Sequence, residues 1–188
     1  GRGESGPQGE AYSIASECED VIAVSAATGA SLLVGHSYGG LIALEVARNS
    51  KAFRKVAVYE PGVSIDGSMP IDWMPSYEKK LAEGRAVDAL VEFTLADAPP
   101  RIQRTPPGLM RLLILLITST TRMYRPMLSL LHENAREWRE IARLDSSCEN
   151  YRGIAAGVLL MYGGKSDSRA VDLAAGRLPA IIPNCETR

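Results

Sequence analysis

Apolar residues follow two patterns along this chain. Short continuous apolar runs occur at residues 31–34, 56–59 and 158–162. Between them lie longer stretches, such as 12–27 and 38–48, in which apolar residues recur at helical spacing. Runs of this kind that alternate with helices are typical of strands in a parallel sheet, so we predict an α/β fold with helices covering both faces of the sheet.

The pattern changes between residues 63 and 152, where little strand character is found. Helices are predicted at 77–95 and 109–118, and residues 127–144 supply one or two more. A final helix is predicted at 170–178, after the last apolar run. The middle of the chain is therefore interpreted as a helical insertion between two parts of one sheet.

Composition excludes several classes of protein. The 188 residues are 46% hydrophobic and 23% charged, with a formal net charge of -1, which suits a globular protein with one core. Lys and Arg form no long runs, so no nucleic-acid partner is expected. The apolar run at 112–117 is far shorter than the ~20 residues of a membrane span, so no membrane span is expected.

The three cysteines, Cys18, Cys148 and Cys185, are widely spaced and lack CxxC spacing. A zinc site or a disulfide framework is therefore not expected. No glycine-rich phosphate loop or metal-ligand cluster stands out either, so no metal or cofactor is expected. We interpret the cysteines as free thiols in a reducing compartment, which favours a cytoplasmic location. The oligomeric state is left open.

The stretch Gly35-His36-Ser37-Tyr38-Gly39 carries the strongest chemical signal. A predicted strand precedes it and a predicted helix follows it, which is the context of a nucleophile elbow, a sharp turn that exposes a reactive serine. Small residues at 35, 39 and 40 would allow the strand and the helix to approach closely. The alternative is a turn that merely links the two elements.

Together with three other stretches, this motif resembles the α/β-hydrolase family, in particular its esterase, lipase and peroxidase-like branch. Gly1–Gly6 resembles the family's Arg-Gly-x-Gly-x-Ser loop, and Gly35–Gly40 resembles its elbow. Tyr59–Pro61 resembles the end of the strand after the elbow, and Leu159–Asp167 resembles the strand and turn that carry the catalytic acid.

The resemblance implies a partial α/β-hydrolase fold, in which a parallel sheet is flanked by helices and carries a helical cap insertion. Residues 1–62 would form the first part of the hydrolase core with the elbow, 63–153 the cap, and 154–188 the acid-bearing strand and the following helix. The family's strand order places the strand at 55–60 between those at 31–35 and 157–162. Both ends of the family's fold would lie outside this chain, which would then be a fragment.

The resemblance also assigns the catalytic roles. Ser37 would be the nucleophile, and the backbone N–H of Tyr38 would be one donor of the oxyanion hole. The second donor would lie before residue 1. Asp167 would orient the catalytic base, on the same side of the sheet as Ser37, and Glu60 is a rival candidate for the acid.

The catalytic base is not evident. The two histidines are His36, which we expect to pack or hydrogen-bond beneath the turn, and His132 in the cap. The family places its histidine after the acid, and no histidine follows His132. We therefore expect the base to lie outside this chain and the chain alone to be inactive, with recruitment of His132 as the alternative.

These assignments predict a serine hydrolase that cleaves a small ester or a related acyl substrate through an acyl-Ser37 intermediate. Two alternatives stay open. The same site could serve as an acyltransferase, a lyase or a cofactor-free peroxidase, because the fold does not decide among these reactions. The protein could also be a non-catalytic member that retains a binding pocket.

Overall fold

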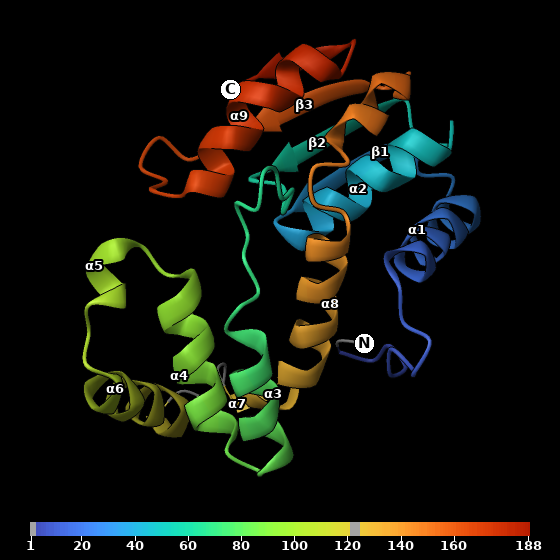
Figure 1. Ribbon diagram of the computed structural model, residues 1–188. Coiled ribbons are helices and arrows are strands. Elements are labelled where there is room, and N and C mark those ends of the chain that lie inside the picture. Colours follow the sequence, from blue (N-terminus) through green and yellow to red (C-terminus); the bar gives the residue numbers. More distant parts are fainter. Residues whose placement is uncertain (1–2, 121–124) are drawn as a thin grey trace. The chain divides into compact units, whose positions relative to one another are not determined.

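The computed structural model describes residues 3–120 and 125–188. Its elements alternate between helices and strands at both ends of the chain, with a helical stretch between them (Figure 1). In chain order they are α1 (Ile14–Thr28), β1 (Leu32–His36), α2 (Tyr38–Asn49), β2 (Lys55–Tyr59), α3 (Met74–Ala82), α4 (Ala86–Asp97), α5 (Pro100–Gln103), α6 (Pro107–Thr120), α7 (Arg125–Ser129), α8 (Leu131–Arg143), η1 (Cys148–Gly153), β3 (Gly157–Met161), α9 (Arg169–Ile181) and β4 (Cys185–Thr187).

The strands form one parallel sheet in the order β1-β2-β3-β4. The register pairs Val34 with Ala57 and Ala57 with Leu159 across the first three strands. The predicted middle position of β2 is thereby confirmed. Because all strands are parallel, the loops that follow β1, β2 and β3 leave the sheet at the same edge.

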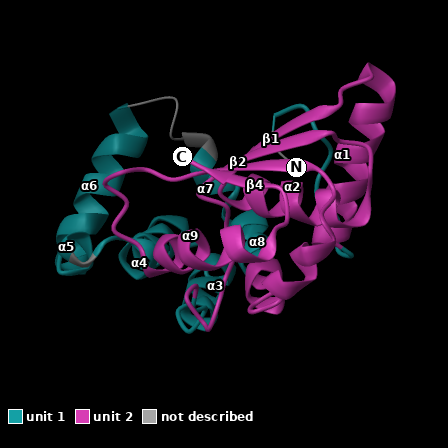
Figure 2. Ribbon diagram, turned by 90° about the horizontal axis from the view of Figure 1, so that it is seen from above, with its two compact units in different colours: residues 1–11, 70–138 teal, residues 12–69, 139–188 magenta. Residues whose placement is uncertain are grey.

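Within residues 12–69 and 139–188, which contain the sheet, the described helices cover one face of it. The helices α2 and α9 lie on the same side of the strands (Figures 1 and 2), and Val58 and Leu160 are fully buried on that side. On the other side Val34 is 76% exposed, at the rim of a shallow hollow of about 340 Å³. The prediction that both faces are covered is therefore wrong for residues 12–69 and 139–188, because the described helices among them pack on a single face.

Two helical predictions need adjustment. The helix predicted at 77–95 is divided into α3 and α4, because Gly84 adopts a φ of 72° that ends α3 in a left-handed turn. The stretch predicted at 127–144 forms the two helices α7 and α8. By contrast, α1 ends at Gly29 with a φ of 70°, close to the predicted end.

The chain divides into two compact units (Figure 2). One contains residues 1–11 and 70–138, and the other contains residues 12–69 and 139–188 with the whole sheet. The assignment of residues 63–153 as a cap stays a prediction. Of the glycine-rich stretch Gly1–Gly6, the first two residues lie outside the described part of the chain.

An aromatic cluster organises the unit formed by residues 1–11 and 70–138. Trp73 makes edge-on contacts with Tyr77 and with Trp138, at centroid distances of 5.2 and 5.5 Å. Phe93 completes the cluster. The hydroxyl of Tyr77 is buried and donates to the carbonyl of Leu131 at 2.8 Å, so that α3 is tied to α8 within this unit.

In the unit that contains the sheet, hydrogen bonds join the two segments that lead to and from residues 70–138. The hydroxyl of Ser64 donates to the carboxylate of Asp145, and the N–H of Gly67 donates to the same carboxylate at 3.0 Å. The N–H of Ser146 donates to the carbonyl of Ser64 at 3.0 Å. These contacts fix the points at which the helical stretch leaves and rejoins the sheet-containing unit.

Candidate active site

Ser37 stands at the sharp turn between β1 and α2. It immediately follows the last residue of the strand and precedes the first residue of the helix. Its backbone has φ 52° and ψ -122°, a combination that glycine adopts readily and a residue with a Cβ atom adopts only under strain. Backbone strain of this kind occurs preferentially at functional sites, which makes the turn the first candidate for chemistry.

Four backbone hydrogen bonds hold Ser37 in this conformation. Its N–H donates to the carbonyl of Tyr59 at 3.1 Å, which ties the turn to β2. Its carbonyl accepts from Gly40, Leu41 and Gly62 at 2.9, 3.2 and 2.8 Å. The conformation is thus fixed both from within α2 and from the loop that follows β2.

Two glycines make this arrangement possible. A Cβ atom on Gly35 would lie 2.3 Å from the carbonyl oxygen of Gly39, and one on Gly40 would lie 2.9 Å from the Cα of Pro61. Both distances are too short for a real contact, so the strand, the helix and the loop can meet only with glycine at these positions. Gly39 differs, because its Cβ would enter open space. The expected need for a small residue at 39 is not supported sterically.

The side chain of Ser37 is exposed, and its hydroxyl makes no hydrogen bond with any described residue. Tyr38 is the first residue of α2, at the helix end where the dipole favours negative charge. The Tyr38 hydroxyl accepts a hydrogen bond from Tyr12 at 2.9 Å, which anchors its ring. The hydroxyl of Ser37 is therefore accessible beside the positive end of a helix.

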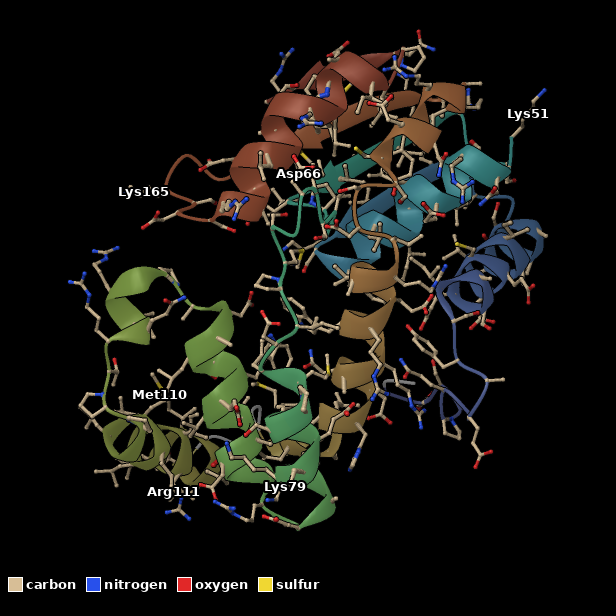
Figure 3. The ribbon with its side chains drawn as sticks, in the orientation of Figure 1. Lys51, Asp66, Lys79, Met110, Arg111 and Lys165 are labelled. Carbon is tan, nitrogen blue, oxygen red and sulfur yellow. The ribbon has the colours of Figure 1, made fainter. Side chains whose placement is uncertain are left out.

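Asp167 lies in the loop between β3 and α9, two residues before the helix begins. Its side chain is exposed and makes no hydrogen bond or ion pair with the described residues. Lys165 projects from the same loop (Figure 3). Since β1 and β3 are parallel, Ser37 and Asp167 both follow the carboxyl end of a strand. Their approach within reach of one base stays a prediction.

Glu60 is held more firmly than Asp167. It follows β2 with a φ of 42°, and its Oε1 atom accepts from the N–H of Gly163 at 2.9 Å and from the hydroxyl of Ser166. The hydrogen bond from Ser166, with a smaller contribution from Gly163, lowers the pKa of Glu60 below its usual value. Glu60 is thus an ionised anchor for the loop that carries Asp167.

Gly163 leaves room for this carboxylate. A Cβ atom on Gly163 would lie 2.7 Å from Ser166 Oγ and 2.9 Å from Glu60 Oε1. The contact between Tyr59–Pro61 and Leu159–Asp167 is not predicted by the sequence, although both stretches resemble parts of the family's site. Glycine at 163, two residues after the end of β3, is the signal that could have indicated a close neighbour.

The two histidines occupy different units. The ring of His36 packs on Tyr59, its partner on β2, with centroids 5.5 Å apart. His36 is exposed there and does not lie beneath the turn as expected. His132 is an exposed residue in the first turn of α8 and belongs to the unit that lacks Ser37.

Within residues 3–120 and 125–188, no group of three or more His, Cys, Asp or Glu side chains is arranged to hold a metal ion. None of the helices described there combines the length and the apolar character needed to cross a bilayer.

Comparison with known proteins identifies the family. The sequence model of the alpha/beta hydrolase family matches residues 1–186. The chain belongs to the alpha/beta hydrolase family. No significant match was found among curated proteins.

Solved structures support the fold of this alpha/beta hydrolase. An alpha/beta hydrolase from Sphaerobacter thermophilus is 27% identical, with a TM-score of 0.78 over 100% of this chain and 70% of that one. MGS-M2, an alpha/beta hydrolase from a Medee basin deep-sea metagenome library, is 16% identical, with a TM-score of 0.71 over 100% and 66%. The esterase RhEst1 from a Rhodococcus species is 19% identical, with a TM-score of 0.57 over 98% and 66%. The chain thus spans about two thirds of the length of these structures.

Proposed function

We propose that this alpha/beta hydrolase is a serine hydrolase that cleaves a small ester or a related acyl substrate. One observation carries the proposal: Ser37 has a strained backbone between β1 and α2 and presents an exposed hydroxyl. A strand, a sharp turn and a helix around a reactive serine form the nucleophile elbow of this family. In a plain connecting turn, nothing would favour a strained non-glycine residue at that position.

In the proposed reaction, Ser37 Oγ attacks the acyl carbon and its proton passes to a base. The bond to the alcohol breaks, the alcohol leaves with a proton, and water then hydrolyses the acyl-serine. The backbone N–H of Tyr38, at the positive end of α2, would stabilise the oxyanion. Such a donor is worth about 10²–10³ in turnover.

For the acid, we propose Asp167 as the residue that orients the base. Its carboxylate is not engaged by the described residues, so its oxygens can accept from an imidazole. Glu60 already uses Oε1 to hold Gly163 and Ser166. We therefore propose Glu60 as a positioning residue for the loop that carries Asp167, with a role as the acid as the alternative.

For the domain organisation, we propose that residues 63–153 form the cap and that residues 1–62 and 154–188 form the core. The described helices α3 to α8, which lie between β2 and β3 in the chain, support this division. The three cysteines are free, which supports a reducing compartment such as the cytoplasm.

An ester is the proposed substrate class, in keeping with the esterase RhEst1, which shares the fold of this chain. The test is hydrolysis of p-nitrophenyl acetate by the complete gene product, together with intact-mass detection of an acyl adduct. Ser37→Ala should remove the adduct and lower turnover by roughly 10⁴-fold or more. Ser16→Ala, an exposed serine on α1, is the matched control and should leave both unchanged. Full turnover in Ser37→Ala would exclude Ser37 as the nucleophile.

Residues 1–188 alone should not turn over this ester. No histidine follows Asp167 in them, and Val34 is exposed on the open face of the sheet, which favours aggregation. The measurement is Ser37-dependent release of p-nitrophenol by the isolated chain, with light scattering to follow its solubility. A soluble chain with such activity would show that a group within these residues serves as the base, and His132→Ala would then test the alternative.

A further inference from the structure

The helix α6 exposes a stripe of leucines on the side opposite to its buried side. Positions 109, 112, 113 and 116 follow the i, i+3, i+4, i+7 spacing that places residues on one helix face. This stripe, here called the leucine face, comprises Leu109, Leu112, Leu113 and Leu116, which are 49%, 53%, 42% and 51% exposed. The buried side comprises Met110, Ile114 and Thr118.

The outer side of α6 differs from that of a typical surface helix. A helix at the surface of a globular protein normally directs its apolar stripe to the core and its polar residues to water. In α6 the inner stripe packs within its own unit, against α4, and the outer stripe is also aliphatic. Met110 and the adjacent Arg111 project from different sides of α6 (Figure 3). The leucine face is therefore an apolar surface that packing within its unit does not explain.

The chain segment that contains α6 carries charge of one sign in the sequence. Between Asp97 and Glu133 the sequence holds five arginines and neither Asp nor Glu. Arg101 in α5 and Arg104, directly after α5, precede α6 in the chain and are exposed, and in the described part of the chain neither makes an ion pair. Arg111, the charged residue of α6 itself, donates to Asp88 at 2.8 Å.

We propose that the leucine face, with the flanking arginines, binds the surface of a bilayer that contains anionic phospholipid. Aliphatic side chains beside basic ones are the composition of helices that lie in the membrane interface. Arginines near an anionic surface each add electrostatic attraction. With 14 residues, α6 is about 21 Å long and too short for the ~30 Å hydrocarbon core, so the helix would lie in the interface.

A second copy of this chain suits the leucine face less well. Pairing two such helices would bring their arginine-rich segments together, and neither segment carries an acidic residue to neutralise them. An anionic lipid surface supplies the missing negative charge. This proposal does not depend on the role of Ser37.

The test is co-sedimentation of the complete gene product with vesicles of phosphatidylcholine alone and with vesicles that also contain phosphatidylserine. We expect stronger binding to the anionic vesicles, weakened by salt. The double variant Leu112→Ser/Leu116→Ser should weaken binding at least tenfold. Val24→Ser is the matched control, because Val24 is equally apolar and 61% exposed but lies on α1.

The double variant Arg101→Gln/Arg104→Gln should remove the preference for anionic vesicles while keeping the fold, which circular dichroism and thermal melting check. Equal sedimentation of the wild type with and without vesicles would overturn the proposal. So would unchanged binding in a folded leucine variant. If light scattering shows that the leucine variant converts an oligomer to a monomer and vesicle binding is absent, the face belongs to a second copy instead.

Discussion

The strained backbone at Ser37 predicts that a substitution there changes stability in an unusual direction. Ser37→Gly and Ser37→Ala both remove the hydroxyl, so both should lose acyl transfer. Only glycine relieves the strain, because alanine keeps the Cβ atom that disfavours φ 52° and ψ -122°. The comparison of the two variants therefore isolates the strain from the loss of the hydroxyl.

The expected magnitude follows from two opposing effects. A non-glycine residue in such a sparsely populated region costs about 1–3 kcal/mol. Glycine in turn lowers the free energy of unfolding by about 0.4–1 kcal/mol relative to alanine, because the unfolded chain gains conformational freedom. The difference favours Ser37→Gly over Ser37→Ala by about 0–2.6 kcal/mol, with a midpoint near 1.3 kcal/mol. At about 2–4 °C per kcal/mol for a chain of this size, that midpoint corresponds to about 3–5 °C in Tm.

The assay is thermal and urea unfolding of the complete gene product and of both variants, with esterase turnover measured in parallel. We expect the glycine variant to be the more stable of the two and both to be inactive. A glycine variant that unfolds before the alanine variant would refute the strain argument. The assignment of Ser37 as nucleophile would still rest on the turnover of Ser37→Ala.

Three further predictions concern the residues around the elbow. Asp167→Asn should lower turnover by roughly 10⁴-fold, because it mis-sets the tautomer of the base, whereas Glu60→Gln should have a smaller effect. The reverse order in kcat would make Glu60 the acid. The pKa of Glu60 in the folded protein is lowered from 4.5. Above pH 4.5 the free energy of unfolding of the wild type should therefore exceed that of Glu60→Gln, and this difference should disappear as the pH falls through the lowered pKa. Urea melts at several pH values measure it. Gly35→Ala should destabilise the protein by about 1–3 kcal/mol in such melts, and Gly39→Ala, whose Cβ meets open space, should not.

The sheet could be predicted from the sequence because its signal is local. Three apolar runs of strand length alternate with helical periodicity, and β1, β2 and β3 form where those runs lie. The cover of the sheet could not be predicted in the same way. A run such as Val56–Val58 indicates that both faces are apolar, but it contains no information on whether a helix packs on each of them. The exposure of Val34 depends on distant segments, which a local pattern does not describe.

The division between α3 and α4 illustrates a different limit. Apolar residues keep nearly the same spacing on both sides of Gly84, so periodicity alone predicts one helix. The backbone of Gly84, with a φ of 72°, ends the first helix. A glycine inside an apolar pattern is a weak signal, because helices also tolerate single glycines.

At the candidate site, the sequence indicated Ser37 through its flanking glycines, which are close to it in the chain. It did not indicate the partners of Glu60, because Gly163 and Ser166 lie about a hundred residues away. Contacts between the ends of neighbouring strands depend on the register of the sheet. That register pairs Tyr59 with Met161, and the position of the loop after β3 follows from it.

The strained backbone conformation of Ser37 persists only because hydrogen bonds and packing from several neighbouring segments hold it in place. Release of the turn would break the hydrogen bond of Ser37 to Tyr59 on β2 and that of Gly62 to the Ser37 carbonyl. It would also open the close contact between Gly40 and Pro61. Each backbone hydrogen bond contributes about 0.5–1.5 kcal/mol, so these two bonds together are comparable to the ~1–3 kcal/mol of strain. The rigidity of the elbow therefore depends on contacts with β2 and with the loop that follows β2. Glu60 lies in that loop, and its hydrogen bonds extend this rigidity to the loop that carries Asp167.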